Sequence, residues 1–287
     1  MAAPSTPLDG VDLAELEEVA ARVARAAGRL IVDERPDDLR VTSKSTDTDP
    51  VTEMDQRSQE LILRLLGEER PDDAVMGEEE GSASGTSGLT WVIDPIDGTV
   101  NYLYGIPSYA VSVAVVTGDP TRAGSWESVA GAVLNPETAE LFSAHRGGGA
   151  RLTTPRGSRT LHATDATDLG MALVGTGFGY AASTRVRQAA LLVDLLPRVR
   201  DIRRHGGAAL DLCGLAAGRL DAYYETALNP WDRAAGELVA REAGAVVGGP
   251  VDDVPTRDLV WGSAPGLAEE FGALVRALSA RHVGPLD

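Results

Sequence analysis

The sequence predicts a mixed α/β protein whose two halves build different kinds of sheet. Short apolar runs follow one another directly over residues 74–146, which is typical of antiparallel strands. Over residues 171–281, strand-like runs alternate with helical ones, which is typical of a partly parallel sheet covered by helices. The 287 residues suffice for two closely packed halves. We expect an N-terminal α+β half over 1–155 and a C-terminal α/β half over 156–287, in one compact unit.

The first half is expected to begin with two amphipathic helices. Apolar residues recur at helical spacing over 11–32, with acidic residues early and arginines late, as the helix dipole favours. A second helix is expected from near Asp55 to before Pro71, and the polar segment 36–53 should be irregular or a hairpin. Strands are expected at 74–77, 89–94, 108–116, 129–135 and 139–146, followed by a strand pair or loop over 147–161.

The second half is expected to alternate between strands and helices. Its predicted strands are 171–177, 199–204, 220–225 and 260–265, and its predicted helices are 184–196, 207–219, 230–244 and a last one ending near 281. Pro230 near the start and Gly244 at the end of the third helix are typical helix boundaries.

Composition narrows the functional class. The net charge of −17 argues against a general nucleic-acid binder, because phosphate backbones require Lys and Arg for neutralisation. The negative charge does not argue against a phosphate substrate, since bound cations can make the local charge positive. The single cysteine, Cys213, fits a reducing compartment. No signal peptide and no apolar run of membrane-spanning length are present, so we expect a cytoplasmic protein without a membrane partner.

The most informative segment follows the apolar strand at 91–93 and reads Asp94-Pro95-Ile96-Asp97-Gly98-Thr99. Two carboxylates stand three residues apart, Pro95 fixes the turn, and Gly98 permits close backbone approach. Thr99 can begin a short helix whose free N–H groups point back towards the acids. Asp-Pro or Asp-Gly alone is more often a simple turn. The whole string directly after a buried strand favours a site for hard cations and phosphate.

Three further acids stand at the boundaries of predicted elements. Glu78 follows the strand at 74–77, although an acidic run of this kind is more often a solvated turn. Asp232 lies in the first turn of a predicted helix, which the helix dipole alone can explain. Asp55 is, in isolation, better explained as a helix N-cap.

Two glycine-containing segments also lie between a strand and a helix. The small residues Gly206, Gly207 and Ala208 can expose amides to a phosphate or hydroxyl-rich ligand, and close packing of strand on helix explains them equally well. The string GTGFG at 175–179 lacks the full spacing of a dinucleotide fingerprint, and no helix follows at once. We therefore assign no nucleotide site to it.

Together, the acids at positions 55, 78, 94, 97 and 232 predict a metal centre. A set of carboxylates without a His or Cys cluster favours Mg²⁺ or Mn²⁺ over zinc. Two such ions about 4 Å apart can neutralise phosphate oxygens, orient a water and stabilise a leaving alkoxide.

With these motifs the chain resembles the inositol monophosphatase family of Mg²⁺-dependent, lithium-sensitive sugar phosphatases. The likeness runs in order over about residues 12–280 and looks closest to bacterial inositol-1-phosphatases. It rests on two main motifs, at 91–115 and 229–247, and on supporting segments at 44–55, 77–81 and 206–225. The resemblance implies a layered αβαβα sandwich and a homodimer.

The resemblance also implies a set of metal ligands. Glu78, Asp94 and the carbonyl of Ile96 would hold a first Mg²⁺, and Asp94, Asp97 and Asp232 would hold a second. Glu78 would help to place a third, weaker ion.

The same likeness implies roles around the substrate. Thr99 and Asp55, with Glu78, would orient and deprotonate the attacking water. The amides of Gly98 and Thr99 would bind phosphate oxygens, next to Asp97 and Asp232. The polyol would contact Glu225 and the backbone of Gly206, Gly207 and Ala208, and Lys44 would line the site.

The sequence departs from the family pattern at two places. Gly207 stands where a hydroxyl residue is frequent, and Asn229-Pro230 precedes Trp231. Because both places touch substrate recognition, they bear on which ester is preferred.

We therefore expect hydrolysis of a small polyol or sugar phosphate, with myo-inositol 1-phosphate as the first candidate. Glu225 supports a hydroxyl-rich substrate, since a carboxylate accepts hydrogen bonds from sugar hydroxyls. Histidinol phosphate, fructose 1,6-bisphosphate and 3′-phosphoadenosine 5′-phosphate are the alternatives with the same chemistry. A regulatory protein that has kept the phosphatase fold is the alternative of another class, and the acidic balance weighs against RNA as its partner.

Overall fold

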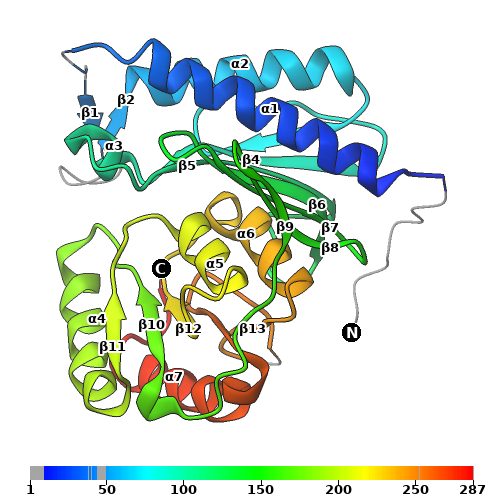
Figure 1. Cartoon of the computed structure of the whole chain (residues 1–287). Helices are drawn as coiled ribbons and strands as arrows, with labels where there is room; N and C mark the ends of the chain where they lie inside the picture. The colour runs from blue at the N-terminus through cyan, green and yellow to red at the C-terminus, as the bar shows by residue number, and fades with distance from the viewer. Residues whose placement is uncertain (1–9, 38, 40, 44–49, 252, 287) are drawn as a thin grey trace.

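The chain folds into five stacked layers that alternate between helices and sheets (Figure 1). The computed structural model describes residues 10–37, 39, 41–43, 50–251 and 253–286. The first layer consists of α1 (Leu13–Asp33) and α2 (Glu53–Glu69), the middle layer of α5 (Ala208–Ala216) and α6 (Pro230–Glu242), and the last layer of α4 (Ala182–Leu195) and α7 (Ala268–His282). A sheet lies between each two helical layers, so the predicted αβαβα sandwich is confirmed.

The first sheet has seven strands in the order β3-β4-β5-β6-β7-β8-β9. Only β3 and β4 run parallel, and all later neighbours are antiparallel, as the uninterrupted run of strands predicts. The strands are β3 (Ala74–Gly77), β4 (Leu89–Asp97), β5 (Ala110–Gly118), β6 (Trp126–Asn135), β7 (Glu140–His145), β8 (Gly149–Thr154) and β9 (Gly157–Thr160). The segment 147–161, expected as a strand pair or loop, forms the β8–β9 hairpin.

The second sheet has five strands in the order β11-β10-β12-β14-β13. Strands β11, β10 and β12 are parallel, whereas β14 pairs antiparallel with both β12 and β13, so the sheet is partly parallel as expected. The strands are β10 (Leu173–Thr176), β11 (Asp201–Arg203), β12 (Ala222–Glu225), β13 (Val246–Gly248) and β14 (Val260–Ser263). The division at residue 155 stays a prediction.

Packing explains the composition of each layer. The outer helix α1 buries one stripe, including Leu16, Val23 and Ile31, against apolar side chains of the first sheet. Helices α5 and α6 are covered by sheets on both sides and approach each other closely, so their contacts are rich in alanine and glycine. A Cβ on Gly236 of α6 would lie 2.8 Å from Cβ of Leu212 of α5, which shows how near the two helices come.

The remaining elements are short. Strands β1 (Val41–Ser43) and β2 (Pro50–Thr52) form an antiparallel pair within the segment 36–53, which we expected to be irregular or a hairpin. Helix α3 (Thr99–Tyr104) follows β4, and single 3₁₀ turns occur at Leu169–Met171, Leu196–Arg198 and Pro265–Leu267. None of the helices in the described part of the chain combines the length and the apolar character needed to cross a membrane.

Candidate active site

Strand β4 delivers its two carboxylates by losing its register with β5. The paired residues shift between Asp94 and Asp97, next to Pro95, which has no N–H to donate to the ladder. The amide of Ile96 donates to Oδ1 of Asp94 at 3.0 Å, and this bond closes the turn. Both carboxylates therefore leave the sheet at one place instead of on opposite faces.

Gly98 turns the chain from strand β4 into helix α3. Its φ of 91° lies in the left-handed region that favours glycine, and it caps α3, which begins at Thr99. A side chain there would press on the backbone, because its Cβ would lie 3.2 Å from the carbonyl oxygens of both Ser108 and Gly206. The predicted short helix after the acids is confirmed.

The structure brings most of the predicted residues into one pocket of about 240 Å³. It lies where the ends of β3, β4 and β12 meet the beginnings of α3, α5 and α6. The predicted residues that line it are Glu78, Asp94, Ile96, Asp97, Thr99, Gly206, Gly207, Ala208, Glu225 and Asp232. Lys44 lies outside the described residues.

Asp55 lies behind Thr99 and is fully buried. It is not the N-cap of α2, as its position suggested in isolation: Thr52 is the N-cap, and Asp55 is the third helical residue. Its carboxylate accepts the backbone N–H of Thr52 at 2.8 Å, which forms a capping box. The other carboxylate oxygen lies 3.2 Å from Oγ1 of Thr99, so Asp55 reaches the pocket through that hydroxyl.

The Thr99 hydroxyl has two acceptors within reach. Besides Asp55, it lies 3.1 Å from the carbonyl oxygen of Ile96. A hydroxyl carries one proton, so it donates to only one of them at a time, and its lone pairs stay available to a second donor such as water.

Asp232 is placed by the same device as Asp55. It is the third residue of α6, and its carboxylate accepts the backbone N–H of Asn229 at 2.6 Å. Pro230 stands at the start of the helix, where its missing N–H costs nothing. Asn229 and Pro230, the departure noted in the sequence, thus fix the helix turn that carries the acid.

Asp97 connects the first sheet to the middle helices. Its Oδ2 accepts the backbone N–H of Ala209 at 2.8 Å, in the first turn of α5. A Cβ on Gly207 would come 2.9 Å from the same oxygen. Any side chain at Gly207 must therefore displace the carboxylate or the loop, which gives a local reason for glycine at this departure from the family pattern.

Burial and crowding raise the pKa values of Asp94, Asp97 and Asp232. The pKa of Asp94 lies well above its ordinary value because of burial and the negative charges of Glu78, Asp97 and Asp232. Burial, opposed by the amide of Ala209, raises the pKa of Asp97 to about 7. The pKa of Asp232 also lies well above its usual range, first because of burial and then because of Glu78.

Glu225 ends strand β12 on the other side of the pocket. Burial raises its pKa to about 8, although the Tyr223 hydroxyl donates to it at 2.8 Å. A Cβ on Gly177 would overlap this carboxylate. Glu225 at the end of β12 therefore packs against Gly177, which follows the end of β10 and leaves room for the carboxylate.

The donor set fits a hard divalent cation in kind. Four carboxylates and the carbonyl of Ile96 face one pocket. The mutual repulsion that adds to burial in raising the pKa values of Asp94 and Asp232 is what a cation relieves. Among the described residues, no three His, Cys, Asp or Glu side chains are already grouped as ligands of one ion. Binding would therefore require these carboxylates to turn towards a common point.

Several lining residues were not predicted from the sequence. Arg204 and Arg257 bring the basic side chains, and Phe178, Gly179 and Tyr180 add a wall before α4. The glycines of GTGFG, which we set aside as a nucleotide motif, were the signal for this wall, because Gly177 makes room for Glu225. No sequence pattern pointed to Arg257, because only the folded structure brings its loop to the pocket.

Comparison with known proteins agrees with this geometry. The model of the inositol monophosphatase family matches residues 12–280. The chain belongs to the inositol monophosphatase family. The inositol-1-monophosphatase SuhB of Mycobacterium tuberculosis is 46% identical over 245 residues, which cover 82% of this chain and 81% of that protein. The resemblance stated from the motifs is thereby confirmed.

Other relatives carry a different name. The Nus factor SuhB of Escherichia coli is 39% identical over 233 residues, covering 80% of this chain and 83% of that protein. In three dimensions, the solved structure of Mycobacterium tuberculosis SuhB matches with a TM-score of 0.79 at 43% identity, covering 93% of this chain and 98% of that one. Sequence and fold thus agree on the family, and the relatives' names differ in what they say about function.

Proposed function

We propose that this protein is a Mg²⁺-dependent phosphomonoesterase that hydrolyses myo-inositol 1-phosphate or a similar polyol or sugar phosphate. The observation that carries the proposal is the pocket in which Glu78, Asp94, Asp97 and Asp232 meet beside the helix that begins at Thr99. Such a pocket suits a cation and a phosphate together. The family membership and the relative named inositol-1-monophosphatase support it.

Two or three Mg²⁺ ions would be held by this set, with Mn²⁺ as an alternative. Glu78, Asp94 and the carbonyl of Ile96 would serve one ion, and Asp94 would share the next with Asp97 and Asp232. When bound, the ions supply the positive charge that neutralises the phosphate oxygens and makes water more acidic.

The remaining residues would position the reactants. Thr99, held against Asp55, would orient the attacking water, and Asp55 would take its proton through the hydroxyl. The amides of Gly98 and Thr99 would bind phosphate oxygens. Water attacks phosphorus opposite the ester oxygen, the ester bond breaks, and the leaving alkoxide takes up a proton to give the alcohol and inorganic phosphate. No covalent phosphoenzyme is expected.

The substrate's alcohol part would face the second sheet. Glu225 can accept hydrogen bonds from hydroxyl groups, and the backbone of Gly206, Gly207 and Ala208 lines the same side. Lys44 is proposed as a further lining residue from the segment before Asp55. Lithium sensitivity, a homodimer and a cytoplasmic location belong to the same proposal.

A substrate panel with Mg²⁺ tests the proposal. We expect kcat/KM to be highest for myo-inositol 1-phosphate, compared with histidinol phosphate, fructose 1,6-bisphosphate and 3′-phosphoadenosine 5′-phosphate. A preference for one of the other three would keep the chemistry and replace the substrate. Phosphorylated protein trapped during turnover would contradict direct attack by water.

A regulatory role is the second candidate, because several relatives are named Nus factor SuhB. A protein that acted only through partners would not need five acids around one pocket and its neighbouring hydroxyl. No turnover of any of the four esters with Mg²⁺ or Mn²⁺ would favour the regulatory role over the enzyme.

A further inference from the structure

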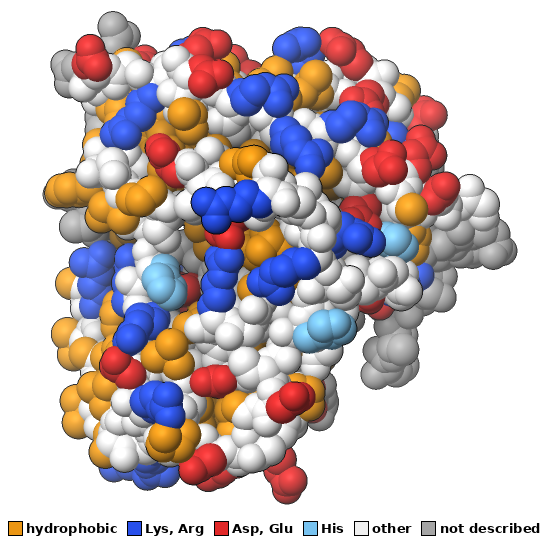
Figure 2. Space-filling model, in the orientation of Figure 1, with side chains coloured by type: hydrophobic (Ala, Val, Ile, Leu, Met, Phe, Trp, Pro, Cys, Tyr) orange, Lys and Arg blue, Asp and Glu red, His pale blue; other side chains and the backbone are white. Residues whose placement is uncertain are grey.

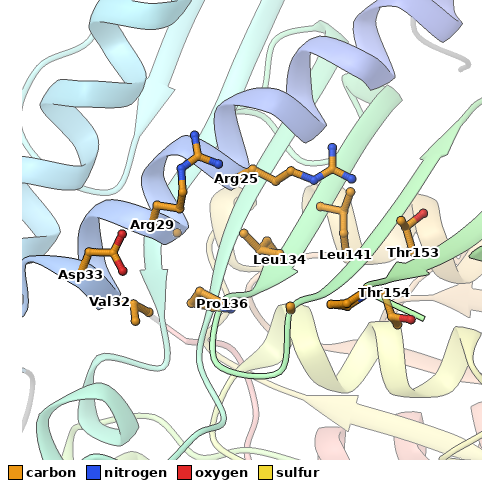
Figure 3. A pocket seen from close by; sticks show the side chains of 12 residues that line it. Arg25, Arg29, Val32, Asp33, Leu134, Pro136, Leu141, Thr153 and Thr154 are labelled. Atoms are coloured by element: carbon orange, nitrogen blue, oxygen red, sulfur yellow. The ribbon is translucent and has the colours of Figure 1, made fainter. Parts of the chain in front are cut away.

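A second cavity, of about 360 Å³, lies on the other side of the first sheet from the middle helices (Figure 3). It opens between the C-terminal half of α1, the turn that joins β6 to β7, and the end of β8. Its volume falls in the range of small-molecule sites. It shares no lining residue with the candidate active site.

The floor of this cavity is apolar. Leu134 and Leu141 lie at its base and are almost completely buried, and Val32 and Pro136 complete the apolar wall. A Cβ on Gly28 would come 2.5 Å from Cδ2 of Leu134, so α1 touches the strands at this glycine and the cavity lies beside the contact. An apolar group of a ligand would find partners here without any change in the backbone.

The rim carries two arginines one helical turn apart. Arg25 and Arg29 are exposed on α1 and line the cavity, and neither forms an ion pair or hydrogen bond with any other described residue. Figure 3 shows that both side chains come from the helix above the leucines. Like charges at this spacing repel each other on a helix, so an anion between them is stabilised by both.

Other arginines on the first helical layer are compensated. Arg22 pairs with Glu69 at 2.5 Å, Arg57 pairs with Glu34, and Arg64 pairs with Glu68 at 3.4 Å. Within α1 and α2, Arg25 and Arg29 are the two described arginines that have no ion pair with a described acid. Figure 2 shows more widely that basic side chains can gather on one face of this acidic protein.

The other polar groups of the rim favour the arginines as the recognition element. The hydroxyl of Thr154 donates to the carbonyl of Gly157, and the hydroxyl of Thr153 lies 3.1 Å from that of Ser158, so both are used within the β8–β9 hairpin. Asp33 stands at the end of the rim beyond Arg29 and would repel a second negative charge. The cavity therefore suits one anionic head group and an apolar body.

We propose that this cavity is a binding site for a small amphipathic anion, whose head group is held by Arg25 and Arg29 and whose apolar body packs on Leu134 and Leu141. The proposal is independent of the phosphatase proposal, because no residue of the pocket at Asp94 takes part in it.

The test uses octanoate as the probe and the full chain as the protein. Isothermal titration and the methyl NMR signals of Leu134 and Leu141 should both show saturable binding. The neutral analogue octan-1-ol should bind at least about tenfold more weakly, since one charge-assisted contact contributes that much. The variant Arg25→Ala/Arg29→Ala should lose binding by a similar factor or more, and Arg25→Lys/Arg29→Lys should lose less.

A matched control changes two arginines of the same helical layer outside the cavity. Arg22→Ala/Arg64→Ala carries the same change of charge and should bind octanoate as the unchanged protein does. No saturable binding, equal binding of octan-1-ol, or an equal loss in the control would overturn the proposal. So would a double variant at Arg25 and Arg29 that changes only the oligomeric state, because the occupant would then be a second copy of the chain.

Discussion

At Asp94, burial and three neighbouring negative charges act in the same direction. They raise the pKa of a carboxyl group that the proposed function needs as a shared metal ligand. Asp94→Asn should therefore separate stability from activity. We expect kcat/KM with Mg²⁺ to fall on the order of 100-fold or more, because a charged ligand is lost. The metal-free variant should be more stable than the unchanged protein at pH 8, since the repulsion is removed, and urea unfolding measures this.

The control for Asp94→Asn is Asp72→Asn, the same change at an exposed acid outside the pocket. It should leave both activity and stability nearly unchanged. Wild-type rates in Asp94→Asn would show that the carboxylates at the end of β4 are not the metal centre.

Thr99 should act through its hydroxyl and not through its methyl group. The hydroxyl stands 3.2 Å from Asp55 and 3.1 Å from the carbonyl of Ile96, a geometry that serine can reproduce. Thr99→Ala is expected to lower kcat by roughly 100-fold with little change in KM, within the range of a lost proton-transfer group. Thr99→Ser should recover most of the rate. Equal rates for the Ala and Ser variants would contradict the proposed role.

Prediction from sequence succeeded for residues that are close together in the chain. Asp94, Asp97 and Thr99 lie within six residues, so strand, turn and helix signals could be combined there. Asp55 was placed wrongly as an N-cap, because Thr52 three residues earlier offers the better cap and leaves Asp55 as its capping-box partner. The hydrogen bond between Asp55 and Thr99 spans 44 residues, and no local signal predicts it.

Among the elements, His205 connects two helices that begin at the pocket. Its carbonyl accepts the side-chain amide of Asn101 in α3 at 2.6 Å, and its Nδ1 lies 2.5 Å from Oδ1 of Asp211 in α5. The amide of Asn101 also donates to the carbonyl of Ser108 at 2.7 Å. The loop before α5 is thus fixed to both helices, next to Gly206 and Gly207.

His205→Ala should loosen the substrate side of the pocket without removing any of the proposed metal ligands. We expect KM for the preferred ester to rise about three- to tenfold and kcat to change less than twofold, because the residue positions the loop backbone and does not contact the proposed metal ligands. His162→Ala, at an exposed histidine remote from these contacts, is the control. A fall in kcat with an unchanged KM would contradict a positioning role.

At the scale of elements, length and pattern decided what could be predicted. The longer helices carry clear periodicity and the strands of the first sheet are distinct apolar runs, and their positions agree with the structure within a few residues. Strand β13 has only three residues, Val246–Gly248, so no alternation could reveal it. It forms by pairing with β14 at the edge of the sheet, and this pairing exists only once the sheet is assembled.

For the whole molecule, the sequence predicts which elements form but not how the layers stack. The bond between Asp97 and Ala209 joins residues 112 positions apart, and it fixes the first sheet to the middle helices. Stacking also depends on the small residues of α5 and α6, whose role is visible only once both sheets cover them. The layered sandwich therefore came from family resemblance, whereas the alternation of strands and helices came from the residues.

The raised pKa values predict how the metal-free molecule responds to pH. Well below pH 3.8, Asp97 is protonated in both the folded and the unfolded chain. Between its ordinary pKa of 3.8 and its folded pKa of about 7, the folded chain keeps a proton that the unfolded chain has released. Stability therefore falls as pH rises through this window, and Glu225, with a pKa of about 8, extends the fall upwards. His205, whose pKa is raised by Asp211, acts in the same direction.

Magnesium should reverse this fall in stability. The reversal distinguishes the effect of the pocket carboxylates from that of the other titrating groups. Mg²⁺ competes with protons for the same carboxylates, so it should raise the midpoint of thermal unfolding more at pH 8 than at pH 5. Sodium chloride at equal ionic strength controls for screening of the −17 net charge. In Asp94→Asn the difference between the two pH values should shrink, because one shared ligand is missing. An equal Mg²⁺ effect at pH 5 and pH 8, or a metal-free protein whose stability rises over this range, would contradict the assignment of these carboxylates to a cation site.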